Sequence, residues 1–269
     1  MDTKPRFPRD AFAGTAEHYL RYRLPYPDSL VRDLLARAGA PAGRLLDLGC
    51  GPGRAPLPLA GSFREAWAVD FEPEMIEAAR REAARRGVTN IRWMVGTAEE
   101  LEARAASFDL VTAADAFHRL DQPRVAGLAL RWLRPGACIA VIGSRGLMSS
   151  GAPWQRVAAD VMRRYASIAP QAGLSPPPGR DPAAERTEVV LRGAGFIEVA
   201  SHSFTEPHDW TLETIVGNLF STSVCSRHAL GASADALAAE LRSALLAHDP
   251  HGRYHEEAPF GYTLGRKPS

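Results

Sequence analysis

Two carboxylates and a run of glycines form the clearest chemical pattern in this chain. The stretch LLDLGCGPGRA, Leu45–Ala55, is an apolar run that contains Asp47 and passes directly into a glycine-rich turn. Glycine lets bare backbone approach a ligand closely. Asp70 ends the next apolar run, EAWAVD, where a carboxylate can accept hydrogen bonds from both hydroxyls of a ribose. The pattern predicts a site for a nucleoside-like ligand.

The spacing of the glycines separates two classes of ligand. A dinucleotide fingerprint reads G-x-G-x-x-G, whereas here Gly49 and Gly51 are followed by Arg54 in the third glycine position. Pro52, Pro56 and Pro58 also remove N–H donors that a pyrophosphate at a helix N-terminus would need. We therefore expect a ligand with a ribose but no pyrophosphate, which disfavours a nicotinamide-dependent oxidoreductase.

Residues around the turn supply further contacts for such a ligand. Asp47 offers an anion for an ammonium group, and Phe71 and Met75 can pack on an adenine face. The segment GTAEEL, Gly96–Leu101, follows a third apolar run, where backbone amides and Thr97 can read the adenine edge. Together they suit a nucleoside that carries an amino-acid group.

Alternating elements must position these residues. Apolar runs alternate with helical patterns from about Arg44 to Gly143, which is typical of a parallel sheet wrapped by helices. The predicted strands are RLLDLG, EAWAVD, NIRWMV, FDLVTA, ACIAVIG, FIEVASHSF and GYTLGR, and the predicted helices lie near 27–39, 54–61, 73–86, 123–133, 183–193, 211–220 and 234–247, with another in GLMSSGAPWQRVAADVMRRYASIAP. Gly87 and Gly136 follow two of these helices, as left-handed caps would. Helices outside the alternating core are expected to cap the strand ends, and 173–182 is expected to be a proline-rich loop.

The ordered motifs resemble those of the class I S-adenosylmethionine-dependent methyltransferases. The resemblance rests on LLDLGCGPGR, AVDFEPEMIEAAR, VGTAEEL, FDLVTAADAFHRLD and LRPGACIAVIG, and covers roughly residues 15–145. YLRYRLPYP, Tyr19–Pro27, is similar to the Y-x-x-Y-R-x-x-Y-P opening of a broad bacterial subgroup that contains small-molecule methyltransferases. The family implies a Rossmann-like, doubly wound, mostly parallel seven-stranded sheet with an antiparallel last strand and a helical cap. We expect an N-terminal helical lid at 1–40, a cofactor-binding α/β core at 41–146, and cap insertions with the last two strands at 147–269, all in a single structural domain.

The resemblance also assigns roles to residues of this chain. Arg23 would pair with the carboxylate of the methionine part, Asp47, Gly49 and Gly51 would hold the methionine end, and Asp70 the ribose. The full set of expected cofactor-binding residues is Arg23, Asp47, Gly49, Cys50, Gly51, Asp70, Phe71, Met75, Thr97, Ala98, Glu99, Ala114 and Asp115. Many relatives carry Asp where this chain has Thr97, and a hydroxyl accepts from the adenine amino group more weakly. The implied cofactor is S-adenosylmethionine, with S-adenosylhomocysteine as product and no metal.

His118, in ADAFHRLD, is the predicted general base. In the family's arrangement its loop faces the sulfonium, and an imidazole with an ordinary pKa of about 6.5 accepts protons at neutral pH. Asp115 is expected to orient His118 or to accept from the cofactor's ammonium group. The predicted acceptor-binding residues are Tyr19, Tyr22, Phe117, His118, Trp154 and Trp210.

Composition excludes several other classes. The chain has 32 basic and 31 acidic residues, a net charge of +1, so it carries no overall attraction for nucleic acid. The N-terminal segment MDTKPRFPRDAF lacks an apolar signal core, no run is long enough to span a membrane, and three scattered cysteines form no disulfide framework. A cytoplasmic enzyme is therefore expected, and a homodimer is left open. HDPHGRYHEE, His248–Glu257, is interpreted as a surface turn rather than a metal site.

Three functions on this scaffold remain open from the sequence. The leading hypothesis is methyl transfer to oxygen or nitrogen of a small organic molecule, such as a specialised metabolite. The alternatives are a carbon methyltransferase and a binding protein that keeps the cofactor site without turnover.

Overall fold

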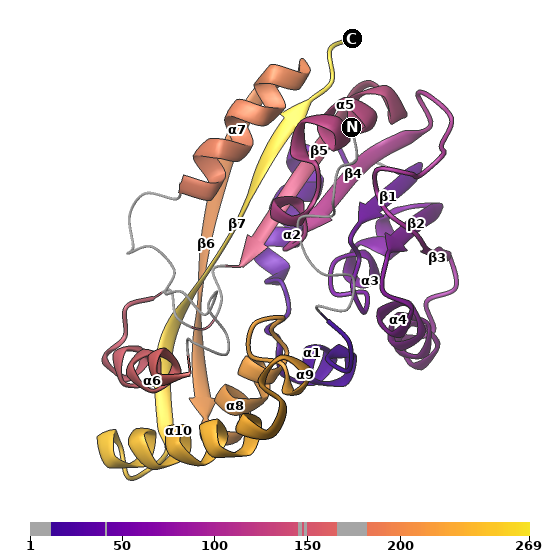
Figure 1. Cartoon of the computed structure of the whole chain (residues 1–269). Coiled ribbons are helices and arrows are strands. Elements are labelled where there is room, and N and C mark those ends of the chain that lie inside the picture. Colours follow the sequence, from indigo (N-terminus) through magenta and orange to yellow (C-terminus); the bar gives the residue numbers. More distant parts are fainter. Residues whose placement is uncertain (1–11, 41, 145–146, 148–149, 166–181) are drawn as a thin grey trace.

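A seven-stranded sheet with the order β3-β2-β1-β4-β5-β7-β6 forms the centre of the protein (Figure 1). The computed structural model describes residues 12–40, 42–144, 147, 150–165 and 182–269. The strands are β1 Arg44–Leu48, β2 Glu65–Asp70, β3 Ile91–Val95, β4 Phe108–Ala114, β5 Leu133–Ser144, β6 Ile197–Thr211 and β7 Arg253–Arg266. The first five pair in parallel, and β7 is antiparallel to both β5 and β6. The predicted fold class is confirmed. Of the predicted loop at 173–182, residues 173–181 lie outside the described residues, and Pro182 begins a helix. The three-part division of the chain stays a prediction.

Helices cover both faces of the parallel strands because successive strand residues point to opposite sides. On β1, Leu46 and Leu48 pack in one buried cluster with helix α5, Gln122–Trp132, and helix α7, Pro182–Ala194. Leu45 points the other way and packs in a second cluster with helix α2, Asp28–Arg37. Because both faces of β1 are buried, the position of the strand is fixed, and so is the position of the glycine-rich turn that follows it.

The other helices of the core frame this turn. Helix α3, Pro56–Leu59, is shorter than predicted and continues as a 3₁₀ turn, Ala60–Ser62. Helix α4 spans Pro73–Arg86, as predicted, and Gly87 ends it with a φ of +68°. The prediction for Gly136 was wrong: α5 ends in extended backbone at Leu133, and Gly136 instead donates its N–H to the Lys267 carbonyl. The chain thus enters β5 directly, without a left-handed cap.

The last two strands are much longer than the apolar runs that predicted them. β7 pairs with β5 only over its second half, Phe260–Arg266, while its first half pairs only with β6. The two strands therefore leave the sheet as a long ribbon, seen on the left of Figure 1. The expectation of a surface turn over His248–Glu257 was wrong for its second half, because β7 begins at Arg253.

The ribbon carries the cap at its far end. Helix α8 (Leu212–Phe220), helix α9 (Arg227–Leu230), a 3₁₀ turn (Gly231–Ser233) and helix α10 (Ala234–His248) lie between β6 and β7 in the chain. Helix α6, Pro153–Arg164, packs against α10, and helix α1, Ala16–Tyr22, packs against α8. The cap has a hydrophobic cluster of its own, which includes Trp154, Trp210 and Leu241. None of the helices within the described ranges has both the length and the apolar character that a membrane crossing requires.

Candidate functional site

The turn after β1 leaves backbone open at one glycine and packs tightly at another. Gly49 and Gly51 have φ values of +67° and +51°, in the left-handed region that favours glycine. A Cβ on Gly49 would lie 2.5 Å from the Cβ of Ala116, in the loop after β4. A Cβ on Gly51 would meet no atom within 4 Å. Gly49 thus lets two loops approach, and Gly51 presents bare backbone to open space.

Asp70 ties the turn after β1 to the end of β2. Its carboxylate accepts the N–H of Gly51 at 2.7 Å and the N–H of Glu72 at 3.0 Å. Burial raises the pKa of Asp70, against the opposing effect of these two amides. The carboxylate therefore fixes the turn and lies at the carboxyl end of the strand, where an α/β sheet binds ligands.

Asp47 is a buried carboxyl with spare hydrogen-bonding capacity. Its side chain is fully buried on β1, and Oδ1 accepts from the Thr112 hydroxyl on β4. Oδ2 is buried without a hydrogen-bond partner among the described residues. Burial raises the pKa of Asp47 to about 7, and the nearby charge of Asp70 acts in the same direction. A buried unpaired acceptor is costly, and a cationic group would satisfy it.

The residues expected around the adenine have mixed surroundings. Phe71 is half-buried after β2, and Thr97 donates to Glu100 at 2.8 Å. Glu99 accepts the N–H of Asp121 at 2.9 Å, which ties the loop after β3 to the start of α5. Three other expected contacts are buried: Met75 packs against α1, Ala98 lies in the cluster with α5, and Cys50 packs against Ile76. Burial also raises the pKa of Cys50. Ala114, at the end of β4, is half-buried.

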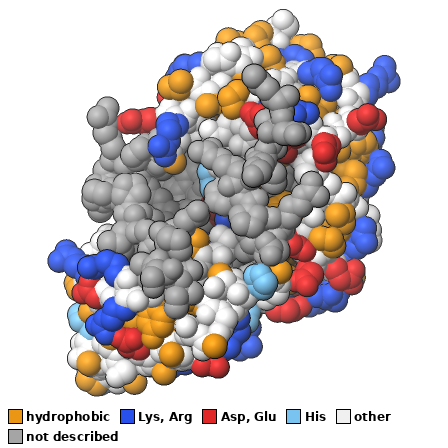
Figure 2. Space-filling view, in the orientation of Figure 1, with side chains coloured by type: hydrophobic (Ala, Val, Ile, Leu, Met, Phe, Trp, Pro, Cys, Tyr) orange, Lys and Arg blue, Asp and Glu red, His pale blue; other side chains and the backbone are white. Residues whose placement is uncertain are grey.

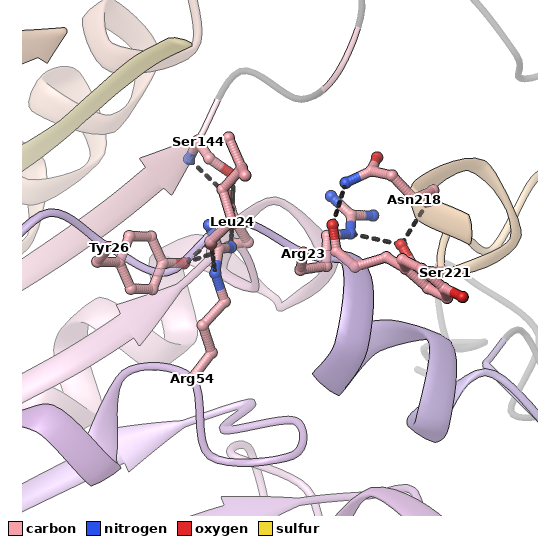
Figure 3. A network of polar contacts seen from close by, with 9 residues as sticks. Arg23, Leu24, Tyr26, Arg54, Ser144, Asn218 and Ser221 are labelled. Carbon is pink, nitrogen blue, oxygen red and sulfur yellow. Dashed lines mark hydrogen bonds and ion pairs between the residues drawn. The ribbon is translucent and has the colours of Figure 1, made fainter. Parts of the chain in front are cut away.

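Arg54, labelled in Figure 3, forms a largely buried ion pair with Asp115, in which the side chains are 10% and 16% exposed. Arg54 Nη1 donates to Asp115 Oδ2 at 2.5 Å, and Nε donates to the Leu24 carbonyl at 2.6 Å. Asp115 also accepts from the Tyr26 hydroxyl at 2.9 Å and from the Ser144 N–H at 2.8 Å. Burial raises the pKa of Asp115, but Arg54 and Ser144 together hold it below its ordinary value. The network joins the N-terminal segment to the ends of β1, β4 and β5.

Sequence reasoning missed this role of Arg54. The residue drew attention only because it replaces a glycine of the dinucleotide fingerprint. Tyr26, in the YRLPYP segment, packs its ring 4.0 Å from the Arg54 guanidinium. The sequence feature that could have predicted the role of Arg54 was therefore the presence of both this N-terminal tyrosine and a basic residue after the glycines.

Arg23 belongs to a second polar cluster, beside the first in Figure 3. Its Nε donates to the Ser221 hydroxyl at 2.8 Å, just after α8. Asn218, on α8, donates to the Tyr22 carbonyl at 3.0 Å, and the Tyr19 ring lies 5.1 Å from the Arg23 guanidinium. The N-terminal segment is thereby attached to the cap.

The residues expected to bind the acceptor do not all lie together. His118 is exposed on the 3₁₀ turn Phe117–Arg119 after β4, while Phe117 is buried in the α5 cluster. Tyr22 donates to Glu213 at 3.1 Å. Trp154 and Trp210 are both buried in the cap cluster.

A small cavity lies between the two polar clusters and the ribbon. Its lining combines polar and apolar groups from distant parts of the chain: Arg23, Leu24, Arg54, Ser144, Leu147, Trp210, Asn218, Glu256, Ala258, Pro259 and Phe260. Glu256 was missed by sequence reasoning because it falls in the predicted surface turn. Its partner Trp210 donates an indole N–H to it at 2.6 Å.

Charge on the visible surface is mixed. Acidic and basic side chains lie next to one another on the face that Figure 2 shows, which agrees with the net charge of +1. Among the described residues, no group of three or more His, Cys, Asp or Glu side chains is arranged to hold a metal ion.

Comparisons with known proteins show similarity to methyltransferases. Residues 45–136 match the family described as methyltransferase domain. Nocamycin O-methyltransferase of Saccharothrix syringae is 31% identical over 245 residues, which cover 84% of this chain and 86% of that protein. Aklanonic acid methyltransferase DauC of Streptomyces sp. strain C5 is 48% identical over 71 residues, but these cover only 25% of this chain and 32% of the relative.

A solved structure extends the similarity to the whole fold. A protein described as a putative type II methyltransferase from Anaeromyxobacter dehalogenans is 25% identical, with a TM-score of 0.64 over 92% of this chain and 98% of its own. The long match to the nocamycin enzyme and the shared fold both extend well beyond residues 45–136. This chain therefore belongs to the class I S-adenosylmethionine-dependent methyltransferases.

Proposed function

We propose that this protein transfers the methyl group of S-adenosylmethionine to an oxygen or nitrogen atom of a small organic molecule. The observation that carries the proposal is the buried Oδ2 of Asp47, which has no partner among the described residues, on the strand that leads into the open backbone at Gly51. An ammonium group would satisfy this oxygen, and a nucleoside can approach bare backbone there. The residues present therefore fit an amino-acid-bearing nucleoside.

Three charged side chains are proposed to hold the cofactor. Asp47 binds the ammonium group, Asp70 accepts from the ribose hydroxyls, and Arg23 pairs with the carboxylate. Bound S-adenosylmethionine supplies a methyl group already activated on a sulfonium. The protein then has to hold the acceptor in line with it, and such positioning contributes about 7–11 kcal/mol in well-oriented reactions.

The acceptor is proposed to be a small natural-product-like molecule. Two relatives are named for small molecules, nocamycin and aklanonic acid. The small cavity is lined by apolar as well as polar side chains, some of them from the cap, which suits part of an organic molecule better than a protein or nucleic acid chain. His118 is proposed as the general base that removes the acceptor's proton.

Two measurements test the proposal. Calorimetry should show micromolar binding of S-adenosylhomocysteine and no binding of NAD or NADP. Mass spectrometry on a panel of phenols, enols and amines should find a gain of one CH₂ group, and fragmentation should place it on oxygen or nitrogen. Placement on carbon would support the carbon-methyltransferase alternative, and cofactor binding without any product would support a binding protein.

A further inference from the structure

Glu256 is an acid enclosed by the fold at the wall of the cavity. It lies on β7, where only 2% of its surface is exposed, and its Oε2 accepts the Trp210 indole N–H at 2.6 Å. The next residue, Glu257, points outward and is exposed. Enclosing a carboxyl costs free energy unless its hydrogen bonds are made. Trp210 and Gln155 donate to this carboxyl, which can accept about four hydrogen bonds and therefore has room for a further donor.

The cavity limits what that partner can be. Its volume is about 20 Å³, roughly the room that one water molecule needs. A whole metabolite does not fit, but a single small substituent does. Arg23 and Arg54 line the same cavity, so a cationic amine would be repelled. A neutral hydroxyl can donate to Glu256 and accept from Arg23 or Asn218.

We propose that Glu256 is a specificity-determining residue, which accepts a hydrogen bond from a hydroxyl group of the methyl acceptor inserted into this cavity. The proposal rests on the proposed methyltransferase function and deepens it, because it names a feature that the acceptor must carry. The cavity is suitably placed: Arg23, the proposed carboxylate ligand, and Ser144, at the end of β5, both line it.

The titration of Glu256 offers a way to observe the proposed hydrogen bond. Burial raises its pKa to about 7, while hydrogen bonds from Trp210 and Gln155 lower it. His208 stands opposite Glu256 on β6, His255 precedes it, and Arg23 and Arg54 lie across the cavity. Because the Trp210 indole N–H is bonded to the carboxylate, its NMR resonance should report this titration.

The experiment follows the Trp210 indole resonance in the full-length protein, with and without S-adenosylhomocysteine. Trp210→Phe assigns the resonance, and Glu256→Gln keeps an acceptor for the indole but cannot ionise. Glu257→Gln is the matched control on the opposite side of the strand. The probes are phenol, anisole, which lacks the O–H donor, and benzylamine, which is cationic.

We expect phenol, but not anisole or benzylamine, to shift the resonance and to lower the pH midpoint of its titration. The phenol affinity should fall about tenfold or more in Glu256→Gln, as for a lost hydrogen bond to a charged group, and stay unchanged in Glu257→Gln. Equal effects of phenol and anisole, or equal phenol affinity in both variants, would overturn the proposal.

Turnover gives an independent reading once a panel member is methylated. Glu256→Gln should raise KM about tenfold or more, with kcat and S-adenosylhomocysteine affinity close to wild type. An unchanged KM would also overturn the proposal. Failure of the proposed function would look different, since S-adenosylhomocysteine would then bind neither variant nor wild type.

Discussion

Asp47 is a buried side chain that is costly for folding and that would be useful in the proposed cofactor binding. Its pKa of about 7 lies above the ordinary value of 3.8, so the folded state binds a proton more tightly than the unfolded state. Its contribution to stability is therefore full below the ordinary pKa and is lost as pH rises through the folded value. An ammonium group would need the ionised form, so the proposed cofactor binding should have the opposite pH dependence.

From this we predict that S-adenosylhomocysteine binds more tightly as pH rises from 6 to 8, by up to about tenfold per pH unit below the Asp47 pKa. Calorimetry across this range measures it. Asp47→Asn should bind at least about tenfold more weakly and lose most of the pH dependence. The assignment of Asp47 to the ammonium group would be wrong if wild type and variant bound equally at pH 8.

His118 provides a second prediction at the same scale. His118→Ala should keep S-adenosylhomocysteine affinity, because the residue is exposed on the turn after β4 and away from Asp47 and Asp70 in the chain. Turnover should fall about 10²–10⁴-fold, the usual contribution of a positioned base. His251→Ala, at an exposed site before β7, is the control. Turnover of His118→Ala near wild type with saturating acceptor would remove the base assignment.

The scale of helices and strands shows what could be predicted from the sequence. The strands β1, β4 and β5 were recognisable because strands buried on both faces read as continuous apolar runs. The edge strand β3 has no buried residue and was recognisable only from its place in the alternation of strands and helices. The full length of the outer ribbon was not predicted, since β6 alternates exposed and half-buried residues and contains Pro207, and β7 contains Pro259. The glycine turn was recognisable from spacing alone. The contact between Trp210 and Glu256 depends on the register of two strands separated by the cap, which spacing does not reveal.

The ion pair between Arg54 and Asp115 connects the N-terminal segment to the ends of the central strands. Removing one partner should therefore lower the free energy of unfolding. We predict that Arg54→Met destabilises the protein by about 3–5 kcal/mol, because it leaves a buried carboxylate without its cation. Urea unfolding at neutral pH measures the change. Since the pKa of Asp115 is lowered in the folded state, the contribution is complete above 3.8 and is lost as pH falls through the lower folded value.

A matched substitution separates this effect from a general loss of charge. Arg21 pairs with Glu213 on the surface, where the side chains are 69% and 65% exposed. Arg21→Met should change stability by no more than about 0.5 kcal/mol. A similar decrease in the free energy of unfolding in the two variants would mean that burial does not determine how much the Arg54–Asp115 pair stabilises the protein.

At the scale of the whole molecule, the hydrophobic clusters of the parallel sheet are separate from the cluster of the cap, so the proposed binding of cofactor and of acceptor would depend on different cores. The clusters under the parallel sheet hold the turn that is proposed to bind the cofactor, and the cap cluster holds the walls around Trp210. The N-terminal segment bridges them, since Leu24 packs on the cap cluster and on the α2 cluster alike. Weakening one core should therefore affect one task before the other.

Leu241, fully buried on α10, tests this separation. Leu241→Ala leaves a cavity in the cap cluster and should cost about 2–5 kcal/mol. We predict faster hydrogen exchange in α10 than in β1 and β4, a weaker phenol response at Trp210, and S-adenosylhomocysteine affinity close to wild type. Leu246→Ala, on the same helix but 42% exposed, should leave all three unchanged. If Leu241→Ala weakened cofactor binding as much as the phenol response, the cap and the nucleoside site would have to be one cooperative unit, because a local cavity in α10 would then have reached the β1 turn.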